Sequence, residues 1–369
     1  MKKMFAWLLA GTLALGLWGC AGEEAPAEIS APAETAAPSQ ETEETTMETS
    51  VPETETVSAE PLFLKVSSIT FSVVGDSEDI YLGLAPRDQI TWESDDPSVV
   101  SVDKGVLTAT GVGTTTVRAV HGDQILECSA GCLAEDQEAL KSLDPEILRK
   151  PMRGVPEVDL DSPCTFYDNA AMVGDSIVLM MLQSESPGDY LGNLLILARN
   201  GTSMMGLVQR FKNVFFQGVE MNLEDAIAAS GVERVYMLVG SNDIACEPNR
   251  IAYFDNWDVM LERIREKSPG VEVVMISNTP RCKMIVDGKL FAVEVYNKMI
   301  RDYNEQLQQY CREHDYPYLD LSYYIEDHNG DMAKEYNLDG YHMNNDGYMQ
   351  WIRLMRFYAE YEKAGGKLS

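Results

Sequence analysis

Two different hydrophobic patterns follow one another along the chain. From about residue 61 to 133, β-branched and aromatic residues alternate with polar ones in short runs such as "ITWESD" and "VVSVD", and turn residues recur about every ten positions. Alternation with a period of two is typical of half-buried strands, and many short strands at this spacing indicate a small β-sandwich. We therefore expect an all-β domain over residues 61–133 and a linker over residues 134–164.

From about residue 165 to 369, nearly continuous apolar runs alternate with longer amphipathic stretches. The expected strands are residues 169–175, 193–199, 234–240, 271–278 and 316–322, and the expected helices are residues 176–184, 204–216, 250–267, 293–314 and 346–364. Apolar strands separated by helices form a parallel sheet covered on both faces. This region is predicted to be an α/β domain whose functional groups lie where strands end and loops begin.

The first sixty residues show neither pattern. Lys2 and Lys3 precede an apolar run, residues 4–18, which is typical of a secretory signal and short for a transmembrane span. The run ends in "LWGC", which resembles a bacterial lipobox and predicts lipid modification of Cys20. The alternative is an ordinary signal peptide that is cleaved after a small residue. We expect residues 1–20 to be a lipoprotein signal peptide and the protein to be extracytoplasmic, anchored by lipid to the bacterial cell membrane.

Charge and composition limit the partners further. Residues 21–60 hold eleven glutamates and no Lys or Arg, so they are predicted to form a disordered acidic stalk. The net charge of −30 disfavours nucleic acid and anionic membrane surfaces as partners. The six cysteines beyond Cys20 form no CxxC pair, and the four histidines show no ligand spacing with them. We therefore expect no metal or other cofactor, and we expect Cys128 and Cys132 to act as small apolar side chains.

The sequence Val-Gly-Asp-Ser occurs twice, at residues 74–77 and 173–176. The first copy lies between two alternating runs, where a hairpin turn needs Gly for a positive φ and Asp or Ser for local hydrogen bonds, so Ser77 is predicted to be a turn residue. The second copy ends an apolar strand and passes directly into a helix. Ser176 is therefore expected near a helix N-terminus, where developing negative charge is favoured.

Polar groups also follow the later expected strands. The second strand ends in "ARNGTS" with Gly201, and the third ends in "VGSND" with Asn242. Near the C-terminus, "LDGYH" places Asp339 three residues before His342, a spacing that lets the carboxylate orient the imidazole. Taken singly, Ser176 is more simply a helix N-cap and Asn242 a turn residue. Their combination on strand ends favours a hydrolytic site.

Four blocks, "GDS", "NG", "GSND" and "DGYH", occur in that order. The α/β region thereby resembles the SGNH, or GDSL-type, hydrolase family over roughly two hundred residues. One departure is Ile177, because the family has Leu after the serine. The segment "ITWESDDPSVVSVDKGVLTATGVGTTTVRAV" similarly resembles a group 2 bacterial immunoglobulin-like domain.

The hydrolase resemblance implies a flavodoxin-like, three-layer parallel sheet and a role for each motif residue. Ser176 would be the nucleophile, His342 the base that takes its proton, and Asp339 the group that orients the imidazole. The oxyanion hole would comprise the backbone N–H groups of Ser176 and Gly201 and the side-chain amide of Asn242.

These expectations combine into one functional hypothesis. The protein would be a serine esterase that hydrolyses short-chain O-acyl esters, acetyl above all, on a cell-envelope or environmental polysaccharide or a small ester, and would touch the membrane only through its anchor. An O-acyltransferase acting on a glycan, a lysophospholipase or thioesterase, and a non-catalytic cell-surface binding protein are the alternatives.

Other residues are expected to have structural roles. Asp175 is expected to form structural hydrogen bonds beside the nucleophile, and Ser203 to begin a helix. His314 and His328 are expected to be exposed. Core packing is expected for a methionine-rich group, Met172, Met180, Met181, Met204 and Met205.

Overall fold

The computed structural model of the protein describes residues 60–182, 187–211, 213–286, 289–290 and 293–368. The predicted signal peptide with Cys20, and the predicted stalk apart from Glu60, lie outside the described residues. Within the described ranges, the structure has no helix of the length and apolarity that a membrane crossing requires.

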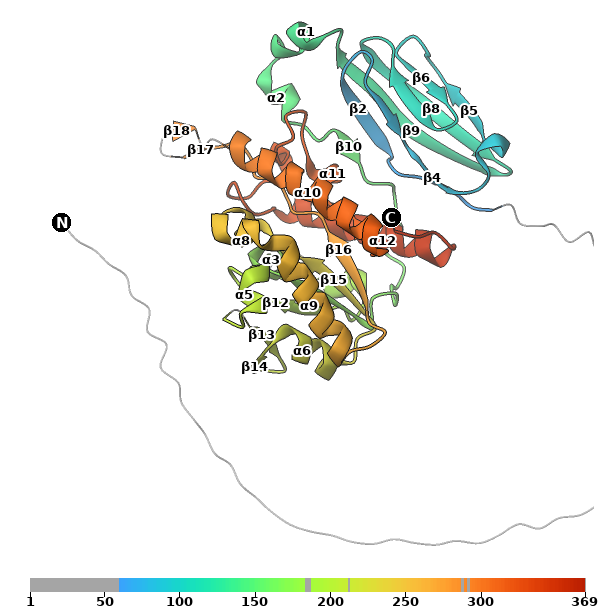
Figure 1. The fold of residues 1–369 in the computed structure, drawn as a ribbon. Coiled ribbons are helices and arrows are strands. Elements are labelled where there is room, and N and C mark those ends of the chain that lie inside the picture. The colour runs from blue at the N-terminus through green and yellow to red at the C-terminus, as the bar shows by residue number, and fades with distance from the viewer. Residues whose placement is uncertain (1–59, 183–186, 212, 287–288, 291–292, 369) are drawn as a thin grey trace, which may run out of the picture. The chain divides into compact units, whose positions relative to one another are not determined.

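The first described region consists of short strands, as the alternating pattern predicts. Its elements are β1 Leu62–Leu64, β2 Ser68–Val73, β3 Ser77–Asp79, β4 Tyr81–Leu84, a 3₁₀ turn Arg87–Gln89, β5 Thr91–Ser94, β6 Val100–Asp103, β7 Val106–Ala109, β8 Gly113–His121 and β9 Gln124–Ala134. One sheet has the order β10-β2-β9-β8-β5, in which β10 is Arg153–Gly154, a second has the order β3-β7-β6, and β1 pairs with β4. Figure 1 labels β2, β9, β8 and β5 of the first sheet. The assignment of this all-β region as immunoglobulin-like stays a prediction.

The first Val-Gly-Asp-Ser copy forms a turn, but not the predicted hairpin. Gly75 has a φ of 96°, and the Asp76 carboxylate accepts a hydrogen bond from the Val73 backbone N–H at 3.1 Å. However, β2 belongs to the five-stranded sheet and β3 to the three-stranded sheet. The turn therefore carries the chain from one sheet to the other, and exposed Ser77 begins β3.

Residues 134–164 contain more regular structure than a plain linker would. After β9 ends at Ala134 come α1 Gln137–Lys141, α2 Pro145–Leu148 and the short strand β10 Arg153–Gly154. β10 pairs antiparallel with β2, so the chain contributes an edge strand to the five-stranded sheet before it enters the α/β region.

The second region is built on a parallel five-stranded sheet. Its strands are β11 Ala170–Gly174, β12 Leu195–Ala198, β15 Arg234–Leu238, β16 Glu272–Ile276 and β19 Tyr318–Leu319. Their order is β12-β11-β15-β16-β19, and every neighbouring pair is parallel. This flavodoxin-like order confirms the predicted parallel sheet. It also places a topological switch point at the carboxyl ends of β11 and β15, where such folds form their binding crevices.

Helices cover both faces of this sheet (Figure 1). They are α3 Ser176–Met181, α4 Pro187–Leu191, α5 Met204–Val208, α6 Leu223–Ser230, α7 Ser241–Ile244, α8 Glu247–Ile251, α9 Tyr253–Lys267, α10 Glu294–His314, α11 Ser322–Ile325 and α12 Asn345–Lys363, with a 3₁₀ turn at Lys334–Tyr336. Met172 and Tyr236 pack with α3, α11 and α12 on one face, whereas the adjacent Val173 and Val235 pack with α6, α9 and α10 on the other. The predicted three layers are present.

One predicted helix, residues 204–216, is largely wrong. α5 ends at Val208, and Arg210 follows with a φ of 62°, which no right-handed helix contains. The following Val-Phe-Phe forms β13 Val214–Phe216, which pairs with β14 Val219–Met221 in a hairpin. Valine and phenylalanine favour strands, and that preference ends the helix early. In addition, β17 Ile285–Val286 pairs antiparallel with β18 Lys289–Leu290.

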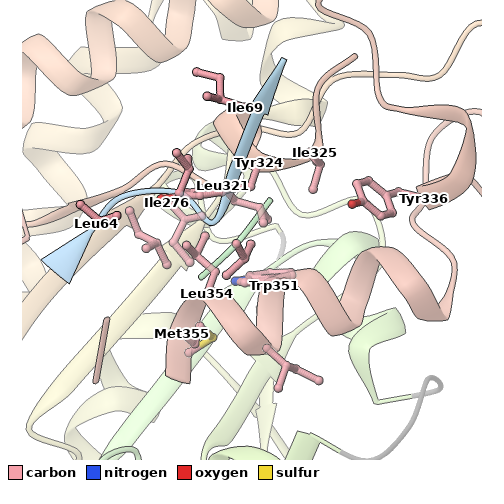
Figure 2. Close-up of a cluster of buried hydrophobic side chains, with 14 of the residues drawn as sticks. Leu64, Ile69, Ile276, Leu321, Tyr324, Ile325, Tyr336, Trp351, Leu354 and Met355 are labelled. Carbon is pink, nitrogen blue, oxygen red and sulfur yellow. The ribbon is translucent and has the colours of Figure 1, made fainter. Parts of the chain in front are cut away.

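The all-β and α/β regions belong to one compact unit, Val57–Ser369, and share a hydrophobic cluster. Figure 2 shows Leu64 and Ile69 from the all-β region beside Leu321, Tyr324 and Leu354 of the α/β region. The Tyr324 hydroxyl donates a hydrogen bond to the Lys65 carbonyl at 2.8 Å. The two regions are therefore packed against each other.

His328 lies at this contact, and the expectation that it is exposed is wrong. Its Nδ1 is 3.0 Å from the Ser72 hydroxyl of β2, and the residue is partly buried. Burial, aided by the positive charge of Arg153, lowers the pKa of His328 to about 4. His314, at the end of α10, is exposed as expected.

Candidate active site

The second Val-Gly-Asp-Ser copy lies where β11 passes into α3. Asp175 is the N-cap of α3, and its carboxylate accepts a hydrogen bond from the Ile177 N–H at 2.9 Å. Gly174 is required by packing, because a Cβ at this position would lie 2.7 Å from the Leu238 carbonyl oxygen of β15 and would also clash with Val178. The glycine thus lets the strand, the following helix and the neighbouring strand approach closely, and it fixes the position of Ser176.

Ser176, His342 and Asp339 form a continuous chain of hydrogen bonds. His342 Nε2 is 2.9 Å from Ser176 Oγ, and His342 Nδ1 is 2.8 Å from Asp339 Oδ2. Asp339 Oδ1 also accepts the backbone N–H groups of Tyr341 at 3.0 Å and His342 at 2.9 Å. An ionised Asp339 requires a proton on Nδ1, which leaves Nε2 free to accept the serine proton.

The protonation of Asp339 is controlled by these contacts. Partial burial alone would raise the pKa of its carboxyl, but the hydrogen bonds from His342 and from the backbone outweigh burial and hold the pKa below its ordinary value. The carboxylate therefore stays ionised at neutral pH and can stabilise a positively charged imidazole.

Asp175 connects the two strand ends, as its expected structural role requires. Its buried carboxylate accepts hydrogen bonds from the Asn242 side-chain amide at 2.8 Å and from the Ser241 hydroxyl. Ser241 and Asn242 begin α7 directly after β15. Burial raises the pKa of Asp175, although the hydrogen bonds from Ser241 and from the Ile177 N–H act in the opposite direction. Asp175 thus connects the end of β11 to the end of β15 across the switch point.

Neither Asn242 nor Gly201, two of the predicted oxyanion donors, presents a free donor to the cavity beside Ser176. Asn242 Nδ2 donates to Asp175 at 2.8 Å and to the Thr202 carbonyl at 2.9 Å, so both amide hydrogens already have acceptors. Gly201 lies on the exposed turn after β12 with a φ of 70°. Asn242 is therefore beside Ser176 as predicted, whereas Gly201 is not among the residues that line the cavity described next.

A cavity of about 140 Å³ opens beside the serine. It is lined by Asp175, Ser176, Ile177, Ser241, Asn242, Thr279, Arg281, Tyr296, Tyr341 and His342. The sequence motifs did not identify the contributions of Thr279, Arg281, Tyr296 or Tyr341. Thr279 and Arg281 follow the end of β16, so the strand-end argument that found Ser176 and Asn242 could also have found them.

The other residues considered in the sequence analysis cap a helix or pack in the core. Ser203 is the N-cap of α5, as predicted, and its hydroxyl accepts the Gly206 N–H at 3.0 Å. Met172, Met181 and Met204 are fully buried, while Met180 and Met205 are partly buried. Cys128 and Cys132 are buried free thiols within the all-β core, as expected of small apolar side chains.

Comparison with known proteins places this site in a family. The model of the GDSL-like Lipase/Acylhydrolase family matches residues 172–350. A search of curated proteins found no match to the chain. Among solved structures, a GDSL-like lipase from Bacteroides thetaiotaomicron is 16% identical with a TM-score of 0.42, over 56% of this chain and 93% of that chain. A putative acylhydrolase from Bacteroides fragilis is 17% identical with a TM-score of 0.42, over 55% and 92% of the two chains.

An acetylxylan esterase from Geobacillus stearothermophilus is 14% identical with a TM-score of 0.34, over 53% of this chain and 93% of that chain. The assignment itself rests on the family model, whose matched range contains Ser176, Asn242, Asp339 and His342. Residues 172–350 of this chain are therefore a domain of the GDSL-like lipase/acylhydrolase, or SGNH, family of ester hydrolases.

Proposed function

We propose that the domain is a serine esterase that uses Ser176, His342 and Asp339 as its catalytic triad. The observation that carries the proposal is the hydrogen-bond chain through these three side chains at the wall of a small cavity. His342 takes the Ser176 proton as Oγ attacks the ester carbonyl carbon, and Asp339 stabilises the imidazolium that forms. His342 then protonates the departing alcohol, and water hydrolyses the acyl-serine by the reverse sequence of proton transfers.

The tetrahedral intermediate needs donors for its oxyanion. The backbone N–H groups of Ser176 and Gly201 and the Asn242 amide are the proposed donors. Because Asn242 Nδ2 already donates to Asp175 and to the Thr202 carbonyl, it must exchange one of these bonds for the oxyanion. The Thr202 bond is the one we expect to yield, since Asp175 carries the stronger, charged acceptor.

The size of the cavity supports a short acyl group. A closed apolar cavity of about 150 Å³ holds one benzene molecule, and the hollow beside Ser176 has a volume of about 140 Å³. An acetyl group fits that space together with part of the alcohol. A hollow of about 470 Å³, lined in part by Met180, Leu338 and Tyr348, shares no lining residue with this cavity and so offers it no extension for the long acyl chain of the lysophospholipase or thioesterase alternative.

We further propose an acylated polysaccharide as the substrate and a lipid anchor at Cys20 as the means of attachment. The exposed ring of Tyr341 at the cavity wall is suited to stacking on a sugar ring. The lipobox-like "LWGC" and the acidic stalk support an extracytoplasmic position away from the membrane surface. Cys20→Ser should release the protein from the membrane fraction, and retention of this variant there would overturn the anchor.

The acyl-length dependence of kcat/KM tests the substrate class. Acetyl, butyryl and octanoyl para-nitrophenyl esters should be hydrolysed with acetyl as the best or an equally good substrate. Each methylene buried in an apolar site contributes about 0.8 kcal/mol, so a long-chain hydrolase would gain steeply along this series. Such a gain would overturn the short-acyl proposal. Product analysis with an acceptor sugar added would detect acyl transfer, which would replace hydrolysis as the proposed reaction.

A further inference from the structure

The end of β16 contributes a cation to the cavity that neither the triad nor the proposed oxyanion hole uses. Arg281 lines the cavity together with Ser176 and His342. Its guanidinium carbon lies 3.2 Å from the ring centre of Tyr296 and 4.3 Å from that of Tyr341. Two aromatic faces thus hold the planar group by cation–π contact and stacking. The Tyr296 hydroxyl interacts with one of its donors, which leaves the other N–H groups for further partners.

Arg281 has no carboxylate partner within the ranges that the structure describes. Two nearby cations do have a carboxylate partner: Lys283 pairs with Glu294 at 2.9 Å, and Arg149 pairs with Glu146 at 3.2 Å. The two carboxylates closest to the chemistry, Asp175 and Asp339, are engaged by their own hydrogen-bond donors. Arg281 is therefore a positive charge at the wall of the cavity that no carboxylate among the described residues neutralises.

A second polar group at the same strand end also lacks a partner. The Thr279 side chain lines the cavity and is only 3% exposed, yet its hydroxyl has no hydrogen-bond partner among the described residues. A buried hydroxyl without a partner typically destabilises the folded protein by about 1–3 kcal/mol. A ligand that accepts a hydrogen bond from the Thr279 hydroxyl would remove that penalty.

The backbone that carries the two side chains is held in place. The Asn297 side chain on α10 accepts the Arg281 N–H at 2.8 Å and donates to the Arg281 carbonyl at 2.8 Å. The Asn297 amide also donates to the buried Asp331 at 2.7 Å. Arg281 is therefore positioned before any substrate arrives, which reduces the entropy lost on binding.

We propose that Arg281 and Thr279 form a carboxylate-binding subsite, so that the esters this domain prefers carry a carboxylate near the scissile bond. A guanidinium presents paired N–H donors that match the two oxygens of a carboxylate, and a threonine hydroxyl adds a third donor. The inference rests on the proposed esterase function and deepens it: an O-acylated acidic sugar has the required chemistry. The net negative charge of the protein does not prevent this, because charges beyond about 8 Å are screened at physiological salt.

Equilibrium binding separates this subsite from the catalytic proposal. The ligands are two uncleavable amides, meta-acetamidobenzoate and its neutral match meta-acetamidobenzamide, titrated into the full chain carrying Ser176→Ala. The carboxylate should bind at least about tenfold more tightly, as expected for hydrogen bonds to a charged group. Arg281→Gln should abolish that preference and Thr279→Val should reduce it without lowering the melting temperature, because the valine has no hydroxyl to leave unpaired.

Arg312→Gln is the matched control, because Arg312 is exposed on α10, bonded to Gln309 at 2.7 Å, and absent from the cavity lining. It removes the same charge and should leave the preference intact. Equal binding of the two amides, or a preference that survives Arg281→Gln or falls equally in Arg312→Gln, would overturn the subsite. A preference confined to Arg281 in a protein that hydrolyses no ester would instead overturn only the esterase proposal.

Turnover then shows which part of the ester carries the charge. One pair of substrates, meta-acetoxybenzoate and meta-acetoxybenzamide, has the carboxylate or its neutral match on the alcohol. The other pair, the para-nitrophenyl esters of glutaric acid and glutaramic acid, has it on the acyl group. For each pair, the measured ratio is kcat/KM of the carboxylate substrate divided by kcat/KM of its neutral match. In at least one pair this ratio should fall about tenfold or more in Arg281→Gln and should be partly restored in Arg281→Lys. Unchanged ratios in both pairs would contradict the proposal.

Discussion

Asn242 makes two hydrogen bonds in the resting site, and the proposed mechanism requires one of them to change. The amide that donates to the Thr202 carbonyl at 2.9 Å must donate to the oxyanion once the serine has attacked. Its contribution therefore arises mainly in the transition state and not in the substrate complex.

Asn242→Ala should accordingly lower kcat by about 10²–10³-fold with little change in KM, as expected for the loss of one oxyanion donor. Steady-state kinetics on an acetyl ester, with the melting temperature measured in parallel, provide the check. A raised KM at unchanged kcat would show that Asn242 binds the substrate in its ground state.

The three residues of the proposed triad could be located from the sequence because each lies in a local motif. Ser176 follows a strand directly, and Asp339 and His342 are close enough to be joined by one loop. Arg281 and Thr279 have no such local motif. Their significance depends on Tyr296 and Asn297, which α10 brings from elsewhere in the chain, and on the missing partners that only a folded structure reveals.

Among the elements, the turn from β11 to α3 tolerates little change. Gly174→Ala would place a Cβ 2.7 Å from the Leu238 carbonyl and against Val178, so β11, α3 or β15 must move. Such a shift displaces Ser176 from His342. Because a misplacement of about 1 Å can lower the rate by about 10²-fold, kcat should fall at least tenfold.

Gly218→Ala is the control for this prediction. Gly218 lies in the turn between β13 and β14 with a φ of 79°, and a Cβ there would meet nothing within 4 Å. The alanine should lower the melting temperature through backbone strain of about 1–2 kcal/mol while kcat remains at the wild-type level. Wild-type kcat in Gly174→Ala would show that the turn does not position the nucleophile.

The pattern of hydrophobic residues predicted the five parallel strands and the long helices well, because each strand lies in a nearly continuous apolar run and each long helix presents many residues with one period. It failed for short elements. The residues of α6 and of the β13–β14 hairpin give too few periods to separate helix from strand, and the end of α5 depends on the backbone conformation of Arg210. The pairing of β10 with β2 depends on a contact across the sequence that no local pattern reports.

At the scale of the whole molecule, the contact between the all-β and α/β regions contains a titratable group. His328 faces Ser72 across the contact, with Arg153 and Asp76 as the charged groups that act on it. Its pKa falls from 6.5 to about 4 on folding. At a pH between these two values, His328 is protonated in the unfolded chain but neutral in the folded protein. His328 therefore destabilises the folded state as the pH drops below about 6.5.

His328→Gln should therefore reduce the loss of stability on acidification. Asp327, whose pKa burial raises to about 7, acts with the opposite sign and is present in both proteins, so the comparison must be between wild type and variant. Between pH 7.5 and pH 5, the melting temperature of wild type should fall by about 2–4 °C more than that of the variant, after allowance for the partial exposure of His328. Equal falls would show that His328 does not titrate at this contact.

The central claim, that Ser176 is the nucleophile of an esterase, is tested most directly by covalent labelling of the whole protein. A fluorophosphonate reacts with a serine that a neighbouring base activates, and mass spectrometry of the digested protein locates the adduct. The account predicts one adduct, on Ser176, with loss of ester turnover in proportion to labelling, no adduct on Ser77, and no labelling of Ser176 in His342→Ala. An adduct on another residue, or complete turnover after Ser176 is labelled, would contradict it.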